Sequence, residues 1–360
     1  MTVSILKTNM KDIDKKLASA LKLINYKPKK KKILIKPNLV YASSPKSGII
    51  THPRLIEALI KYLKNFNCEI IIAEGSAVGH NTEDVFVRTG YKEISDKYNV
   101  KLVDLNKVER KEVKWKYGKI KLPKLLDEYE YISVPTLKTH TITTVTLGTK
   151  NQKGLLDHNT KKLFHVIGVE EAVRALSDII KPDLIIINGL YCLEGNSVSL
   201  IRKSKELGLI IAGTDLFEVD NIGLRIMEID PKNIKHFPII KDIKIVGEDL
   251  NKVKRKFEEP QRIRKIFNIE FQLNGCSGCS VNVERSMRMI IKNPFLLTKF
   301  LYLALLKKVT FVSGYRLKQD LRKGTKVIYI GNCTEKISGG NFIKGCPPDP
   351  REIINAIKRA

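Results

Sequence analysis

The chain has 360 residues, 43% of them hydrophobic and 29% charged, and its 65 lysines and arginines against 38 aspartates and glutamates give a formal net charge of +27. This composition excludes a disordered or disulfide-rich protein, and the length suits one large α/β domain with a smaller unit, or two ordinary domains. The N-terminus lacks the apolar core of an export signal. The longest apolar run, residues 294–312, is interrupted by lysines and is too short to cross a bilayer. We therefore expect a cytoplasmic protein without membrane insertion.

The positive charge raises the question of a nucleic-acid partner, because clustered cations bind phosphates. Lysine is spread along the whole chain, however, and the longest unbroken basic run covers only residues 29–32. No helix-turn-helix, zinc-finger or RNA-recognition signature accompanies it. We therefore expect a solvated basic surface that attracts small anionic substrates, and no nucleic-acid partner.

Hydrophobic periodicity predicts a βαβ unit near the N-terminus. After an amphipathic helix over residues 10–23, a short apolar run over 32–36 has the pattern of a buried strand and is stopped by Pro37. A helix over 53–65 and a second apolar strand over 68–75 follow. Strands connected through a helix pair in parallel, so a parallel sheet is expected.

The same alternation continues over the next 140 residues or so of the chain. Further predicted elements are strands over residues 100–105, 130–134, 184–188 and 207–212, and helices over 82–97 and 168–180. Such alternation is typical of an α/β fold with a doubly wound, mostly parallel sheet. Because ligands bind beyond the carboxyl ends of the strands in these sheets, polar side chains that follow strands are the first candidates for a site.

This rhythm is interrupted over residues 250–261 by a run of charged residues and Pro260. We therefore predict an α/β domain over residues 1–255, with a polar crevice, and a smaller C-terminal module over residues 262–360. A helix over 293–308 carries an apolar face that either packs within this module or binds a partner.

The first polar cluster follows the first two strands. Lys36 and Asn38 lie at the end of one strand, and Thr51 and His52 directly precede a helix, whose N-terminus can bind an anion. A surface lysine and a capping threonine are the alternative. Ser76 lies in a glycine-containing loop that matches neither the Walker nor the dinucleotide spacing, but whose backbone amides can seat a carboxylate or phosphate. All five residues are substrate-binding candidates.

The densest polar cluster follows the strand over residues 130–134. It contains Lys138, His140, Lys150 and Asn151 together with several threonines. We predict catalytic roles for the first three, since a histidine can exchange protons near neutral pH and the lysines can neutralise a carboxylate or phosphate, and a binding role for Asn151. A surface turn rich in threonine and lysine is the alternative interpretation.

Three acidic residues complete the predicted crevice. Glu194 follows the strand over residues 184–188, and Asp215 and Asp220 follow the strand over 207–212. We count all three as substrate-binding candidates, with helix capping as the default role of Asp215.

Four of the six cysteines lie in the C-terminal module. Cys276 and Cys279 form a Cys-x-x-Cys pair, and Cys333 and Cys346 follow far downstream. Two such thiols face one metal centre, and two more complete a four-sulfur site. Twelve residues separate the second pair, whereas zinc ribbons repeat the close spacing, so iron and sulfide are favoured over a zinc staple or a disulfide. Asp349 and Pro350 then begin a capped helix that holds the last ligand loop.

This cysteine pattern, Cys276-x-x-Cys279, Cys333 and Gly-Cys346-Pro-Pro-x-Pro before a helix, resembles the iron–sulfur site of nickel–iron hydrogenase small subunits and related quinone-reductase subunits. The resemblance covers roughly the last quarter of the chain. It implies one [4Fe-4S] cluster as cofactor, bound by the four cysteines as metal ligands.

The first 250 residues resemble the domain of unknown function 362 family, and more distantly the N-terminal domain of the nickel-dependent lactate racemase family. The motifs that carry the resemblance are Lys36-Pro-Asn38-Leu, Thr51-His52-Pro, Glu74-Gly75-Ser76, Lys138-Thr-His140, Lys150-Asn151-x-x-Gly154, Glu194-Gly195, and Ala212-Gly213-x-Asp215 with Asp220. Asn188 and Asn196 depart from the family pattern near Glu194. Members of the first family are often joined to iron–sulfur modules, and the second hints at a hydroxy-acid type of substrate.

Together these observations predict an iron–sulfur oxidoreductase, or a reductively driven enzyme. Its cluster would pass single electrons to a small anionic substrate or to a redox protein partner. Two alternatives stay open at this stage. One is an electron-transfer or cluster-assembly partner without catalysis of its own, and the other is a zinc-stapled protein that binds nucleic acid or nucleotide.

Overall fold

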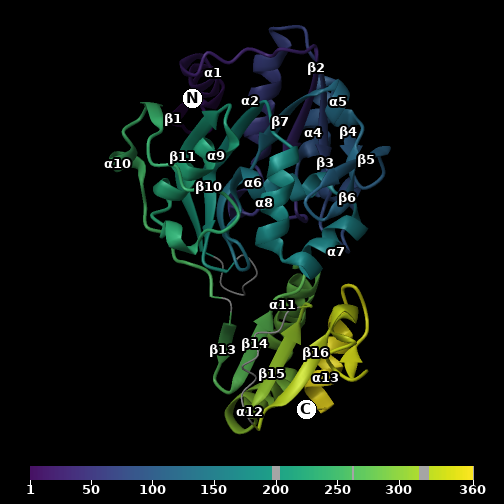
Figure 1. Cartoon of the computed structure of the whole chain (residues 1–360). Coiled ribbons are helices and arrows are strands. Elements are labelled where there is room, and N and C mark those ends of the chain that lie inside the picture. Colours follow the sequence, from purple (N-terminus) through teal and green to yellow (C-terminus); the bar gives the residue numbers. More distant parts are fainter. Residues whose placement is uncertain (197–202, 262, 316–323, 360) are drawn as a thin grey trace.

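The computed structural model describes residues 1–196, 203–261, 263–315 and 324–359. This part of the chain forms a ten-stranded sheet, a separate five-stranded sheet and a two-stranded hairpin, with helices packed around both large sheets (Figure 1). The main path of the ten-stranded sheet runs in the order β12 (Lys244–Gly247), β1 (Thr2–Lys7), β11 (Lys203–Gly213), β10 (Leu184–Glu194), β7 (Glu130–Val134), β2 (Lys32–Pro37), β3 (Glu69–Glu74) and β4 (Lys101–Asp104). Two further strands, β8 (Thr136–His140) and β9 (Thr144–Val145), branch from β10.

The large sheet is mostly parallel. Strands β10, β7, β2, β3 and β4 all pair in parallel, whereas β11 is antiparallel to both of its neighbours, β1 and β10. The prediction of an α/β fold with a mostly parallel sheet is therefore confirmed. The antiparallel pairing lies toward the β12 edge of the sheet. The parallel half, where the predicted site lies, is as the sequence predicts.

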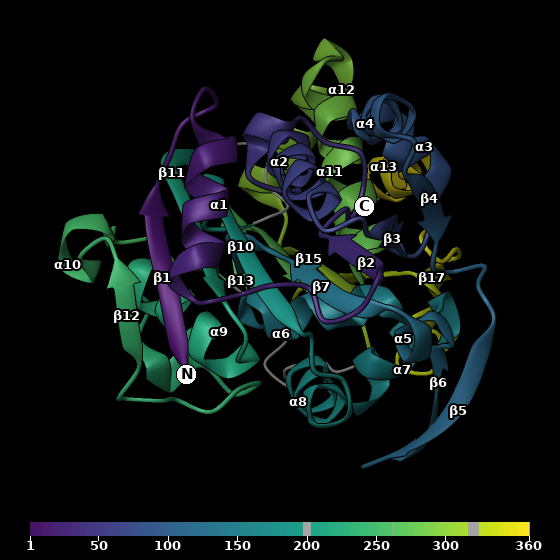
Figure 2. The same cartoon turned by 90° about the horizontal axis from the view of Figure 1, so that it is seen from above.

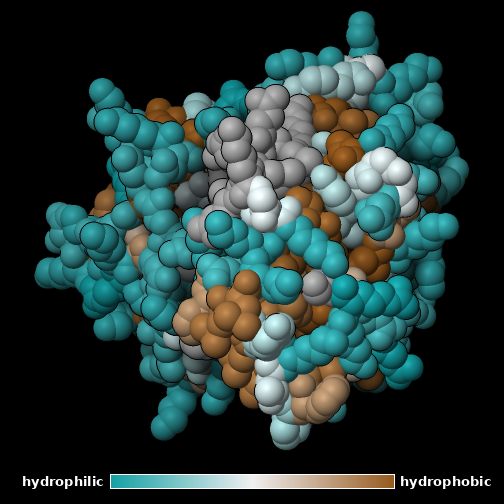
Figure 3. All heavy atoms as spheres, turned by 90° about the horizontal axis from the view of Figure 1, so that it is seen from below, coloured by the Kyte–Doolittle hydropathy of each residue, from teal (hydrophilic) through white to brown (hydrophobic). Residues whose placement is uncertain are grey.

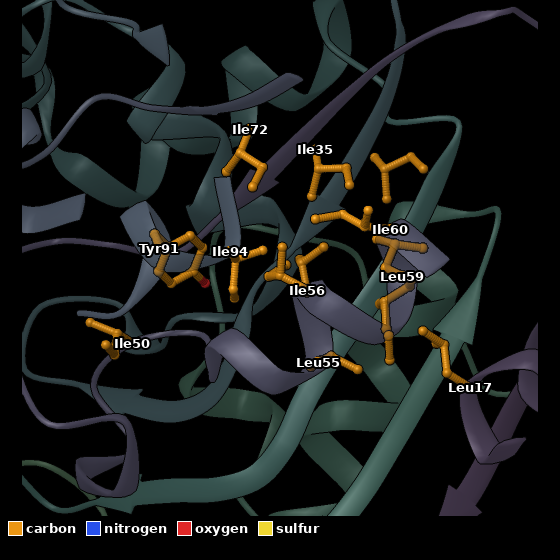
Figure 4. Packing of buried hydrophobic residues seen from close by; sticks show 14 of the residues in the cluster. Leu17, Ile35, Ile50, Leu55, Ile56, Leu59, Ile60, Ile72, Tyr91 and Ile94 are labelled. Atoms are coloured by element: carbon orange, nitrogen blue, oxygen red, sulfur yellow. The ribbon is translucent and has the colours of Figure 1, made fainter. Parts of the chain in front are cut away.

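Helices cover both faces of this sheet, as Figure 2 shows from above. One face carries α1 (Ile13–Leu23), α2 (Pro53–Lys64), α3 (Thr82–Arg88) and α4 (Tyr91–Tyr98), and the other carries α6 (Leu147–Asn151), α7 (His158–Ile167), α8 (Val169–Ile179) and α9 (Leu216–Ile226). Successive residues of β2 alternate between the two cores: Ile33 and Ile35 pack with α1 and α2 (Figure 4), whereas Leu34 packs with α8. Strands buried on both faces explain the continuous apolar runs.

Three predicted elements differ from the structure. The helix expected over residues 82–97 is broken into α3 and α4, because Gly90 adopts φ = +81° between them. The strand expected to end at Asn188 continues to Glu194 through a bulge after Gly189. The stretch after β7, expected as a loop, forms strand β8 because it pairs with the extended part of β10.

Four short elements complete the large domain without entering the main path of its sheet. They are the hairpin β5 (Arg110–Trp115) and β6 (Gly118–Pro123), and the short helices α5 (Leu125–Glu128) and α10 (Leu250–Val253). The hairpin packs Trp115 and Ile120 against the α8 side of the core.

The C-terminal residues form a module around the second sheet. Its strands lie in the order β13 (Ile263–Ile266), β14 (Ile269–Leu273), β15 (Val309–Ser313), β16 (Lys326–Ile330) and β17 (Phe342–Ile343), and β14 to β17 pair in parallel. One core joins this sheet to α11 (Ser277–Ile291), α12 (Pro294–Leu306) and α13 (Pro350–Arg359). In Figure 1 the start of α11 points toward the large domain.

Among the described residues, no single helix has the length and hydropathy needed to span a membrane. One bent pair, Gly278–Ile291 with Pro294–Leu306, passes such a test only when its two helices are taken together, and they meet at 112°.

Candidate functional site

A cavity of about 110 Å³ lies at the carboxyl ends of β2, β3 and β8, where a sheet of this topology is expected to bind a ligand. Its wall is strongly basic. Among the described residues, the charged or titratable ones that line it from the large domain are Lys36, Glu74, Lys138, His140, Lys150, Lys153, Lys161, His165 and Tyr41. Five lysines against one carboxylate make this wall attractive to anions.

Lys36 and Glu74 form a buried ion pair at the floor of the cavity. The Lys36 Nζ lies 3.0 Å from Glu74 Oε1 and donates to the Asn151 Oδ1 at 3.0 Å, and both charged side chains are almost fully buried. Glu74 also accepts from the backbone N–H groups of Leu39 and Gly75. Burial lowers the pKa of Lys36, and the Glu74 charge opposes that shift. The charges of Lys36 and Glu74 therefore compensate each other, so neither group is free to bind a ligand.

The close approach of Gly154 shows how tightly this pair is enclosed. A Cβ at position 154 would lie 2.5 Å from both the Lys36 Nζ and the Glu74 Oε1. No side chain larger than hydrogen fits there without displacing the pair. The Lys150-Asn151-x-x-Gly154 spacing thus places a lysine, a side-chain amide and a glycine next to one another at the floor of the cavity.

Lys138 and Lys150 carry positive charge that the large domain does not neutralise. The Lys138 Nζ donates to the Ile49 carbonyl oxygen at 2.6 Å. Burial, followed by the charge of Lys150, lowers the pKa of Lys138 to about 7, and burial with Lys36 lowers the pKa of Lys150 to about 8. A bound anion would raise both pKa values, so this wall is suited to a negatively charged ligand.

His140 is neutral in this environment. Burial, and then the neighbouring Lys150 and Lys138, hold the pKa of His140 well below its usual value. Its Nδ1 accepts from the backbone N–H groups of Ile142 and Thr143, at 3.2 and 3.3 Å. The proton of the neutral ring is therefore on Nε2, so the ring can act as a hydrogen-bond donor.

The structure brings six of the predicted crevice residues to the wall of one cavity: Lys36, Asn38, Lys138, His140, Lys150 and Asn151. Three others stand behind the wall and support it. Thr51 donates to the Val134 carbonyl at 2.6 Å, and the Ser76 hydroxyl donates to the Leu39 carbonyl at 2.9 Å. His52 caps α2 by accepting from a backbone N–H.

The predicted acidic residues also have structural partners. Asp220 is fully buried and accepts from the backbone N–H groups of Gly148 and Thr149, at 2.7 Å each, which fixes α6 and so Lys150. Asp215 caps α9. Glu194 pairs with Lys205 at 2.8 Å at the far end of β10. None of the three lines the cavity described above.

Sequence reasoning missed Glu74, Lys153, Lys161 and His165 as site residues. The Lys161 Nζ donates to the backbone carbonyls of Gly75 and Ser76, at 2.8 and 3.1 Å, and so holds the loop after β3. Lys153 lies 2.9 Å from the His165 Nε2. The usable signal was the spacing of Lys161 and His165, which lie four residues apart and share one face of α7.

The cysteines lie at the carboxyl ends of parallel strands in the second sheet. Cys276, Cys333 and Cys346 each follow the end of a strand, β14, β16 and β17 respectively, and Cys279 lies in the first turn of α11. Asn332 ties two of these loops together, since its Oδ1 accepts from the Gly345 N–H at 2.7 Å.

The Cys279 and Cys333 thiols both lie close to Gly331. The Cys276 and Cys279 thiols are hydrogen-bonded to each other. A Cβ added to Gly331 would lie 3.2 Å from the Cys279 Sγ and 3.7 Å from the Cys333 Sγ, so this glycine leaves a cradle between them. Burial, and then the charges of the four cysteines, raise the pKa of the Tyr315 phenol.

In the described part of the chain, no three histidine, cysteine, aspartate or glutamate side chains are close enough to hold one metal ion. A single ion bound at about 2.3 Å needs its four sulfurs packed tightly together. A cluster in which each thiolate binds its own iron needs the sulfurs farther apart. Because residue 331 is a glycine, no side chain of this residue occupies the space beside the Cys279 and Cys333 thiols.

The cysteine loops pack directly on the large domain. Cys276 lines the same cavity as Lys138 and Lys150. A Cβ added to Gly278 would lie 2.7 Å from the Val78 carbonyl oxygen, and one added to Gly79 would lie 2.6 Å from the Pro347 Cδ. The loop after β3, held on its other side by Lys161, thus contacts both ends of the cysteine site.

Comparison with known proteins adds two findings. The profile of the family described as "Domain of unknown function (DUF362)" matches residues 33–225, which include every large-domain lysine of the cavity wall and end before the four cysteines of the C-terminal module. The Thylakoid-associated protein sll1697 of Synechocystis sp. is 25% identical over 247 residues, covering 65% of this chain and 76% of that protein.

Proposed function

We propose a function for this chain, which belongs to the DUF362 family. It is a cytoplasmic iron–sulfur oxidoreductase or a reductively driven enzyme. Its substrate is a small anion that binds in the lysine-lined cavity. The observation that carries the proposal is that Cys276 lines this cavity together with five lysines. A thiol-bound redox group would therefore adjoin the anion that the lysines attract.

Substrate binding in this proposal depends on three side chains that can still pair with an anion or donate a hydrogen bond to it. Lys138 and Lys150 would bind a carboxylate or phosphate, because the protein leaves their charges uncompensated. The His140 Nε2–H would donate a further hydrogen bond and orient the anion. Lys36 and Asn151 would fix the floor rather than bind, since they are already paired.

The cofactor side of the proposal depends on Cys276, Cys279, Cys333 and Cys346, which would hold a [4Fe-4S] cluster. When bound, such a cluster supplies single electrons, which we propose come from a reduced protein partner. Lys138 would supply the proton that a reduced substrate takes up, since it lines the cavity and burial lowers the pKa of its Nζ group in the ligand-free protein.

The test is anaerobic purification of the full chain, followed by determination of iron, sulfide and zinc and by a visible absorbance spectrum. We expect iron and inorganic sulfide with broad absorbance near the blue end of the spectrum. A Cys346→Ser variant should lose the iron, whereas Cys68→Ser, which changes a cysteine of the large domain, should keep it. A protein that contains zinc alone would overturn the redox proposal.

The cavity is tested separately. Lys150→Met should keep full iron content and lose binding of the small molecule that co-purifies with the wild-type protein, identified by mass spectrometry. Lys107→Met, which removes an exposed lysine of the same domain, serves as the matched control. Equal ligand binding by Lys150→Met and the control would contradict the assignment of the cavity.

A second candidate is an electron carrier or cluster-assembly partner without catalysis. It is favoured by one observation, the exposure of Cys346, because a carrier needs one edge of its redox group at the surface. It predicts a stable complex with a protein partner and an unchanged rate of electron transfer in Lys150→Met, whereas the enzyme proposal predicts loss of substrate turnover.

A further inference from the structure

The helix α12 exposes large hydrophobic side chains on the side that faces away from its own core. Phe300, Leu303 and Ala304 pack inside the module. On the opposite side Phe295 and Leu306 are 76% and 66% exposed. We define the apolar face as these two residues with their exposed neighbours: Phe267, Phe295, Leu301, Tyr302, Leu305 and Leu306. Figure 3 shows hydrophobic side chains gathered on this lower side of the molecule, with hydrophilic ones around them.

Phe267 joins this face from a separate hairpin. It occupies the turn between β13 and β14, is 66% exposed and has φ = +51°, a conformation that an aromatic residue rarely adopts. The next residue fixes it there: Asn268 donates from its backbone N–H to the Ala304 carbonyl at 2.9 Å and from its Nδ2 to the Leu305 carbonyl at 2.7 Å. The turn therefore holds an exposed aromatic ring beside the end of α12, at a cost in backbone strain.

Along α12 and its flanking residues the charged side chains all have one sign. Between residues 285 and 315 the sequence contains no aspartate or glutamate, but it contains two arginines and four lysines. Lys292 precedes α12, and Lys307 and Lys308 follow it, all three exposed. An apolar surface with cations at both ends of its helix matches the boundary between lipid headgroups and acyl chains when the headgroups are anionic.

We propose that this face docks on a membrane surface that contains anionic lipids. Aromatic and leucine side chains would enter the acyl boundary while the flanking lysines contact the headgroups. A second copy of the chain is disfavoured as the occupant, because it would bring the same lysines face to face on a protein of net charge +27. Nucleic acid would use the lysines but leave the phenylalanines and leucines in water.

The geometry suits attachment rather than insertion. Helix α12 has 13 residues, so at 1.5 Å per residue it is about 20 Å long, shorter than the hydrocarbon thickness of a bilayer. Its inner side is committed to the module's core, so only the outer side is available to lipid. The helix would therefore lie along the membrane surface, with the large domain, which Figure 1 shows on the opposite side of the module, directed into solution.

The test is co-sedimentation of the full chain with vesicles at physiological ionic strength. Vesicles of phosphatidylcholine alone are compared with vesicles that also contain phosphatidylglycerol. We expect binding to the anionic vesicles and little binding to the neutral ones. The triple variant Phe295→Ser/Leu305→Ser/Leu306→Ser should lose binding, whereas Leu23→Ser/Val87→Ser/Ile239→Ser, which removes three exposed apolar side chains of the large domain, should bind like wild type.

Two double variants with the same change in net charge test whether the lysines beside the apolar face matter more than the net charge of the protein. Lys307→Glu/Lys308→Glu should weaken partitioning to anionic vesicles by roughly tenfold or more, since each lysine at the surface contributes to the attraction. Lys11→Glu/Lys15→Glu changes the net charge equally at two exposed positions of the large domain, one just before α1 and one in it, and should have a much smaller effect. Circular dichroism of each variant checks that it is folded. Equal losses in both pairs, or vesicle binding by the apolar triple variant, would overturn the proposal, as would a dimer that forms through this face without vesicle binding.

Discussion

The lysine-lined cavity and the cysteine loops both lie at the carboxyl ends of parallel strands and contact each other, but the protein treats their charges differently. At the floor of the cavity it supplies partners for the charged groups, as it does for Lys36 with Glu74 and for Lys161 with backbone carbonyls, and it leaves Lys138 and Lys150 uncompensated. In the cysteine loops burial, and then the charge of Cys276, raise the pKa of both Cys333 and Cys346. The floor of the cavity is thus charge-compensated by the protein itself, whereas the cysteine site is not.

The two regions also differ in what holds their side chains in place. The floor of the cavity is fixed by a large domain with three hydrophobic cores, so its side chains are positioned before any ligand binds. The cysteine site is supported by one smaller core, and its thiolates repel one another unless a cationic centre lies between them. We therefore expect ligand removal to leave the cavity ordered, and cofactor removal to loosen the C-terminal module.

Removal of the proposed cofactor should have the largest effect on the difference in order between the two regions. In a Cys279→Ser variant, amide hydrogen exchange should become fast in β14, β15 and β16 while β2 and β3 keep wild-type protection. A ligand held at a thousandfold excess over its Kd stabilises the folded state by roughly 4 kcal/mol, all of which the variant would lose. Cys192→Ser is not a suitable control, because Cys192 is buried in the large domain; Cys68→Ser is. Unchanged protection in the module would show that its order does not depend on a bound group.

The next largest effect should come from breaking the floor of the cavity. Glu74→Gln leaves the Lys36 ammonium buried without a countercharge and should lower the free energy of unfolding of the large domain by about 3–5 kcal/mol. Glu128→Gln, which breaks the exposed pair with Lys32, should cost about 0–1 kcal/mol. Urea denaturation followed by circular dichroism measures both, and a small loss in Glu74→Gln would mean that Lys36 is neutral in the folded protein.

The smallest effect concerns the pH dependence of anion binding. Lys138 faces Lys150, Lys36 and Glu74, and the pKa values of Lys138 and Lys150 are lowered to about 7 and about 8, so both lose their charge as the pH rises through this range. The affinity for sulfate, whose own charge is constant here, should fall by up to about tenfold per pH unit for each proton involved. Lys138→Met should bind more weakly at pH 6 and show a shallower slope. Isothermal titration calorimetry tests this, and a pH-independent affinity would exclude both lysines from binding.

The same pKa shifts affect stability in the opposite direction. Lys138 has a folded pKa of about 7 against 10.5 in its unshifted state, so between these values the unfolded chain binds more protons than the folded one. The stability of the ligand-free large domain should therefore rise as the pH increases from about 7 toward 10. A bound anion, which raises the folded pKa, should reduce this rise.

Much of the site could be predicted from sequence because its residues follow apolar strands. Lys36 and Lys138 stand where β2 and the paired extension of the sheet end, and a parallel sheet brings such positions to one edge. Lys161 and His165 could not be placed this way, because they reach the cavity from α7. The position of that helix depends on Phe164, which packs against Trp115 far away in the sequence.

The fold shows the same limit. Strand β1 was not predicted, because its main partner β11 lies about two hundred residues later and its own sequence has no distinctive pattern. The role of Asp220 was also misplaced: a carboxylate after a strand suggests a ligand-binding group, yet here it accepts the free N–H groups at the start of α6. Local pattern identifies such a residue but does not choose between these two uses.

The contacts of Gly278 with Val78 and of Gly79 with Pro347 have a consequence for protein engineering. Each half of the molecule contributes one glycine at which an added Cβ would clash with the other half, so the two surfaces fit closely at these positions. A C-terminal module transplanted from another protein would not seat on this loop unless residues 75–82 travelled with it. The two halves are therefore interchangeable only as a matched set.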